Sequence, residues 1–190
     1  PATTGTYVNA NAGQFIHALD KSLSKTVFST TLGSSRARPD LTPTAFLVNE
    51  CGNIYLSGWG GVVNSRNGYN PTSNTVGLPT TADAFRQTTT GSNFYIAILE
   101  KGAKSLLYGT FIGSTVSSTD GDHVDGGTSR FSKNGVIYQA TCVCRQANFP
   151  STPNVWAVNR GSQDCNNAAF KFDIDRLKAD FDPYQGLTKG

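Results

Sequence analysis

The sequence predicts an all-β fold made of repeated antiparallel units, and two observations carry this prediction. Only 15% of the 190 residues are charged, whereas 20 are glycine, and such a composition is typical of short strands joined by tight turns. A short phrase also occurs three times, reading Pro, any residue, Thr, three residues and then an aromatic residue. Its copies lie at 1–7, 79–85 and 150–156. A period of this kind indicates a repeat architecture.

The segments between the copies of this phrase repeat as well. Residues 15–34 match residues 95–114 at an offset of 80, and residues 51–57 match residues 134–140. A third copy of the first strand begins at 168–173. We therefore predict modules at about 1–78 and 79–149, a partial third module at 150–175, and a C-terminal linker or tail at 176–190.

Each complete module contains two pairs of strand-like segments separated by turn residues. The predicted hairpins are 15–19 with 26–32, 44–48 with 54–58, 94–99 with 106–112, and 127–131 with 136–142. Four-stranded units repeated in this way are typical of β-propellers. We therefore expect propeller-like blades, two complete and a third begun, in a partial or open propeller. The Pro-x-Thr phrase is expected to connect successive units, with its aromatic residue as a wedge between sheets.

The motifs resemble a known repeat family. The stretch Gly52-Asn53-Ile54-Tyr55-Leu56-Ser57-Gly58 and the Pro-x-Thr phrase are similar to SBBP-type β-propeller repeats of bacterial surface proteins. Residues 51–61, 123–131 and 164–167 resemble the propeller-like region of large Bacteroidota surface proteins that carry PKD modules and a gliding-motility-associated C-terminal sorting domain. The resemblance covers most of residues 1–175. It implies export by the type IX secretion route and display at the cell surface, and it implies no catalytic residue.

The chain begins inside one copy of the phrase and contains no Met, so we expect it to be part of a longer protein. Two modules do not close a propeller of four to eight blades. We expect the remainder of a larger surface protein to complete the ring, or copies of the chain to associate, or an open stack to form.

Four cysteines in a chain rich in Thr, Asn and Gly indicate an oxidising, extracellular setting. We predict one bridge from Cys165 to either Cys142 or Cys144, which leaves Cys51 free within this chain. The alternative is a metal site formed by Cys142, Cys144, Cys165 and His123, but the cysteines lack the usual Cys-x₂-Cys spacing.

Asp120, Asp122 and Asp125 form the densest acidic cluster of the sequence. Three carboxylates with neighbouring glycines are suited to bind calcium, although their spacing does not match the calcium loop of EF-hands. The alternative is a solvated loop in which Asp and Gly serve turn geometry. Apart from this calcium, no cofactor is expected.

The sequence favours a non-catalytic structural or adhesion module of a secreted or cell-surface protein. Only two histidines occur and no Gly-x-Ser-x-Gly is present, so a hydrolytic triad is not expected; a glycan-active enzyme is a third, weaker alternative. The net charge of +3 is scattered and no apolar run is long enough to span a bilayer, so neither nucleic acid nor membrane insertion is predicted. The second alternative is a carbohydrate-binding module in which Trp59, Tyr69 or Trp156 stacks on a glycan.

Overall fold

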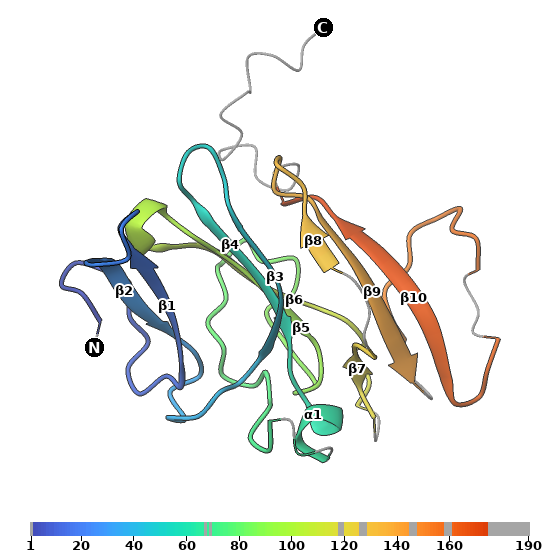
Figure 1. Cartoon of the computed structure of the whole chain (residues 1–190). Helices are drawn as coiled ribbons and strands as arrows, with labels where there is room; N and C mark the ends of the chain where they lie inside the picture. The colour runs from blue at the N-terminus through green and yellow to red at the C-terminus, as the bar shows by residue number, and fades with distance from the viewer. Residues whose placement is uncertain are drawn as a thin grey trace, which may run out of the picture.

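The computed structural model is all-β, with three antiparallel sheets that lie side by side (Figure 1). It describes residues 2–66, 68, 70–117, 120–125, 129–144, 148–157 and 161–174. No helix in this part of the chain is long and apolar enough to cross a membrane.

The first sheet is the hairpin of β1 (Gln14–Leu19) and β2 (Thr26–Leu32). Its turn is closed by the carboxylate of Asp20, which accepts hydrogen bonds from the backbone amides of Ser24 and Lys25. The Ser24 amide and the other donors hold the pKa of Asp20 below its usual value. The predicted pairing of 15–19 with 26–32 is confirmed.

The central sheet has the order β3 (Thr42–Val48), β4 (Ile54–Trp59), β5 (Phe94–Leu99) and β6 (Leu106–Ile112). A 3-10 turn, η1 (Lys101–Ala103), joins β5 to β6. Two strands of the sheet come from each sequence module, so the expectation that the four strands of one module form one unit is wrong. The sequence period shows which segments are equivalent, but it does not show which strand edges pair with each other. The edge of β4 that β3 leaves unpaired forms six residue pairs with β5 of the next module.

The Pro-x-Thr phrase lies where expected only in part. Its copy at 79–85 is in the β4–β5 connection, within the central sheet rather than between successive sheets. Its aromatic residue Phe85 nevertheless packs edge-on against Phe172 of the next sheet, as predicted for a wedge.

In this copy of the phrase, the amide of Thr81 donates to the carbonyl of Gly109, and the amide of Gly109 donates to Thr81 Oγ1. Thr3 makes the same two bonds with Ser29. The threonine therefore attaches the phrase to the second strand of each copy.

The third sheet is centred on β9 (Ile137–Cys144), which pairs with β10 (Cys165–Phe172) over eight residue pairs. The short strands β7 (Asp122–His123) and β8 (Ser129–Phe131) lie along its other edge. The predicted hairpin of 127–131 with 136–142 corresponds to β8 and β9, whereas β7 was not predicted. A short helix, α1 (Val62–Arg66), follows β4.

The strands β4, β5 and β6 of the central sheet are covered on both faces, whereas Phe46 and Val48 of the edge strand β3 stay exposed on the face toward the first sheet. One face, with Tyr95, Ala97 and Leu99, packs on the first sheet; the other, with Phe94 and Ile96, packs on the third sheet. This explains why every residue of β5 is buried and why its sequence is continuously apolar, as for strands covered on both sides.

The sheets stack head to tail. Ile16 of β1 faces the central sheet and its counterpart in the repeat, Ile96, faces the third sheet, so each sheet presents the same face forward. Among the described residues, the stack therefore ends in two different open faces. On the first sheet Phe15, His17 and Leu19 are exposed; on the third sheet Arg130, Tyr138 and Lys171 form an exposed cross-strand row beside Ala140 and Ala169.

Candidate functional site

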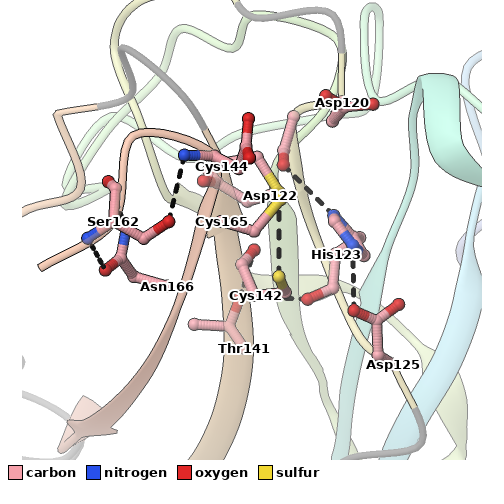
Figure 2. The surroundings of a disulfide bond; sticks show 12 residues. Asp120, Asp122, His123, Asp125, Thr141, Cys142, Cys144, Ser162, Cys165 and Asn166 are labelled. Carbon is pink, nitrogen blue, oxygen red and sulfur yellow. Dashed lines mark hydrogen bonds and ion pairs between the residues drawn. A yellow bond between two sulfur atoms is a disulfide. The ribbon is translucent and has the colours of Figure 1, made fainter. Parts of the chain in front are cut away.

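A polar cleft of about 480 Å³ lies between α1 and the end of the third sheet. Titratable side chains from three separate segments meet there. The lining residues are Val63 and Arg66 of α1, Asp120, His123 and Asp125 in and beside β7, and Asp164 and Cys165 at the start of β10. Figure 2 shows most of these groups around the disulfide.

The disulfide joins Cys144 to Cys165, with a sulfur–sulfur distance of 2.04 Å. Cys165 lies directly opposite Cys144 in the β9–β10 register, whereas Cys142 lies opposite Asn167. The predicted bridge from Cys165 is thus confirmed, and the strand register selects Cys144 over Cys142. The two cysteines are 21 residues apart. Closing a loop of this length adds about 3 kcal/mol to the free energy of unfolding by the chain-entropy model.

Cys142 is a free, buried thiol next to this disulfide. Its sulfur lies 3.7 Å from that of Cys144, and a ring nitrogen of His123 and both sulfurs lie within 4.8 Å of one another. Burial, reinforced by the negative charge of Asp125, raises the pKa of the Cys142 thiol to about 11. The thiol is therefore protonated at neutral pH.

The imidazole of His123 is held on both sides. Its Nδ1 lies 3.2 Å from the carbonyl oxygen of Gly121, and its Nε2 lies 3.3 Å from a carboxylate oxygen of Asp125 (Figure 2). The ring also contacts Trp59, with 6.0 Å between the ring centroids. His123 is buried while Asp125 is exposed to solvent, so the Asp125 contact is the one that is free to exchange.

The structure does not bring together the three carboxylates that were predicted to bind calcium. Asp120 and Asp125 line the cleft. Asp120 forms an ion pair with Arg66, with 2.5 Å between Oδ1 of Asp120 and a terminal guanidinium nitrogen of Arg66. Asp122 is buried and accepts hydrogen bonds from Ser114 and Asn93 instead. Its acceptor oxygens are used inside the protein, and no group of three carboxylates converges within the described residues.

Asp122 has a structural counterpart in the first repeat. Its two oxygens accept from the amide (2.6 Å) and hydroxyl (2.7 Å) of Ser114, and Asp40 accepts from the amide and hydroxyl of Ser34 at 2.7 Å each. Both carboxylates thereby close the connection from one sheet to the next. Gly113, at φ 142°, is required because a Cβ there would lie 2.2 Å from Asp122 Oδ2. Burial raises the pKa of Asp122, and the hydrogen bonds from Ser114 and Asn93 oppose this shift.

The aromatic residues proposed as a glycan platform do not form one surface. Trp59 is buried in the core between the central and third sheets, so it is not available to stack on a sugar. Trp156 is fully exposed, and Tyr69 lies outside the described residues. Cys51 is a free, exposed cysteine, as the predicted bridge implied.

Two cleft residues, Arg66 and Asp164, were not singled out from the sequence, because no local pattern marks either of them. The sequence spacing argues against a metal site at His123 and the cysteines, since Cys-x-Cys on a strand does not match the usual zinc loops, yet the structure brings these side chains together. The chain matches no protein-family model, and no curated protein is significantly similar to it. The resemblance to surface-protein repeats therefore stays a prediction.

Proposed function

We propose that the chain is a non-catalytic, propeller-like repeat module of a secreted or cell-surface protein, acting in adhesion or in a structural layer. Its sheets would be blades, and the module would bind a further repeat of the same protein or a second copy of itself. The observation that carries this proposal is the head-to-tail stack. Two sheet-to-sheet interfaces use the same pair of faces, and within the part of the chain that the structure describes one face of each kind is left open.

The open faces have the composition that such a contact needs. Phe15 and Leu19 are exposed by 71% and 47%, whereas their counterparts Tyr95 and Leu99 are buried against a neighbouring sheet. On the opposite end Tyr138 is 45% exposed, whereas its counterpart Tyr55 is buried and packs edge-on against Phe131 of the next sheet. Unequal faces of this kind associate head to tail, which builds rings or filaments.

The disulfide is compatible with an extracellular location, and display at the cell surface through type IX secretion is what the family resemblance implies. We do not assign an enzymatic activity.

Sedimentation of two face variants tests the stacking proposal. Phe15→Glu places a charge on the open apolar face of the first sheet, and Tyr138→Glu places one on the open face of the third sheet. Each variant alone is therefore expected to lose self-association. Mixed together they should form a heterodimer, since each retains the face that the other lacks. Leu23→Glu, at a turn residue that is 73% exposed, is the matched control and should associate like the parent. A parent chain that is monomeric at every concentration removes self-association and leaves the rest of a larger protein as partner.

A carbohydrate-binding function is the second candidate, because Trp156 is fully exposed on one copy of the repeated phrase. Retention on immobilised glycans that is lost in Trp156→Ala and kept in the Leu23→Glu control supports it. Absence of retention on any glycan dismisses it.

A further inference from the structure

We propose that reduction of the Cys144–Cys165 disulfide turns the back of the cleft into a binding site for a thiophilic divalent metal ion such as zinc. The ligands would be His123, Cys142, Cys144 and Cys165. The oxidised chain has the disulfide instead and does not bind the ion, so the site is controlled by redox state.

The spacing of the sulfurs matches a tetrahedral metal site. Zinc–sulfur bonds of about 2.3 Å at the tetrahedral angle place two thiolate sulfurs about 3.8 Å apart. The sulfurs of Cys142 and Cys144 are 3.7 Å apart, and a nitrogen of His123 lies within 4.8 Å of both. Three ligand atoms are thus close to the positions that one ion requires.

Cys165 supplies the fourth ligand. Its position opposite Cys144 is held by the eight-residue ladder of β9 and β10 in addition to the disulfide. After reduction the two sulfurs are no longer bonded, and a rotation of the Cys165 side chain brings its sulfur to the tetrahedral ligand spacing of about 3.8 Å from that of Cys144.

The surroundings of His123 prepare it as a ligand. With an ion bound at Nε2, Nδ1 would carry the ring proton and donate it to the carbonyl oxygen of Gly121, 3.2 Å away. Nε2 faces the carboxylate of the exposed Asp125, which can turn away to solvent when an ion arrives. A histidine whose second nitrogen donates to a backbone carbonyl is the usual arrangement at protein zinc sites.

The chemistry balances with a dithiol or phosphine as the reductant. The disulfide accepts two electrons and two protons and becomes two thiols, while the reductant is oxidised. The metal ion then displaces the thiol protons of Cys142, Cys144 and Cys165 to water. In the oxidised chain Cys144 and Cys165 are bonded to each other, so only His123 and Cys142 remain and affinity is lost.

The cleft provides a path for the ion. Asp125 and Asp164 at its lining attract cations, and Arg66, which is paired with Asp120, also lines it. Three thiolates, one neutral histidine and one divalent ion give the site a single negative charge.

Titration with Co²⁺ tests the proposal. The chain reduced with a phosphine should bind one Co²⁺ with the visible absorption of a tetrahedral thiolate complex, and Zn²⁺ should displace it; the oxidised chain should not give this spectrum. Cys142→Ser should weaken the affinity of the reduced chain by at least about 100-fold. Cys51→Ser removes the other free thiol and should leave binding unchanged.

Circular dichroism is followed in the same titrations. If reduction loosens the third sheet, metal binding should restore it, because ligands brought together by the ion couple binding to folding. Cys165→Ser cannot form the disulfide and should bind Co²⁺ more weakly, through three protein ligands and water. The proposal is overturned if the reduced chain gives no thiolate–Co²⁺ spectrum, whether folded or unfolded. It is also overturned if Cys142→Ser binds like the parent or if the oxidised chain binds equally well.

Discussion

β1 and β5 are the same strand of the repeat at two places in the stack. β5 has a sheet on each face and every residue is buried, whereas β1 has a sheet on one face and its residues are alternately exposed. The two strand sequences differ at single positions on the face that is covered in β5 and open in β1. β5 has Tyr95 and Ala97 there, and β1 has Phe15 and His17. The comparison teaches that burial in this fold is set by place in the stack, because the strand pattern itself is shared.

The largest expected effect on stability comes from the pair of equivalent residues that differ most in burial, Tyr95 of β5 and Phe15 of β1. Tyr95→Ala should lower the free energy of unfolding by about 3–5 kcal/mol, because a large buried ring is lost, together with its hydrogen bond to the carbonyl of Pro79. Phe15→Ala should change it by less than about 1 kcal/mol. Urea unfolding followed by fluorescence measures both. Equal losses would mean that the face of β1 is also covered in solution.

The second effect on stability concerns the buried carboxylate that both copies of the repeat contain, Asp40 in the first and Asp122 in the second. Asp40→Ala and Asp122→Ala should each cost about 3 kcal/mol, since each leaves buried donors without their charged acceptor. Asp120→Ala, which loses a partly exposed ion pair with Arg66, is the control and should cost less than about 1 kcal/mol. A small loss at Asp122 would contradict its role as a connection between sheets.

The threonines of the repeated phrase should give a smaller and matched effect. Thr3→Val and Thr81→Val keep the shape of the side chain but remove the oxygen that accepts from Ser29 or Gly109. Each should lower the stability by about 1 kcal/mol. Thermal unfolding compares the two variants, and a loss at only one of them would show that the two attachments are not equivalent.

The smallest effect is a pH dependence. Because burial raises the pKa of Asp122 in the folded chain, the folded state keeps its proton at a pH where the unfolded state has released it. The stability from this group is complete below the ordinary aspartate pKa of about 3.9 and decreases as the pH rises through the folded-state value. Asp122→Asn should therefore show a flatter stability profile in mildly acidic buffer than the parent. An unchanged profile would assign the pH dependence to other groups.

Local patterns were sufficient for the elements themselves. The period identified equivalent segments, alternation located the main hairpins to within one or two residues, and the four cysteines indicated a bridge from Cys165. Alternation and turn residues act over fewer than ten residues, and the repeat is found by comparing the sequence with itself, so neither requires the tertiary structure.

The tertiary structure decided the remainder. It paired β4 with β5, so that the sheets cross the sequence modules; it buried Trp59; and it turned Asp122 inward while Asp120 and Asp125 face the cleft. It also placed Cys142, at the position in the third sheet that Trp59 occupies in the central sheet, beside His123 and the disulfide. The sequence alone determined a repeated all-β chain with a bridged cysteine. The edges that pair, the faces that are covered and the side chains that meet depend on contacts between distant segments, and local patterns do not specify those contacts.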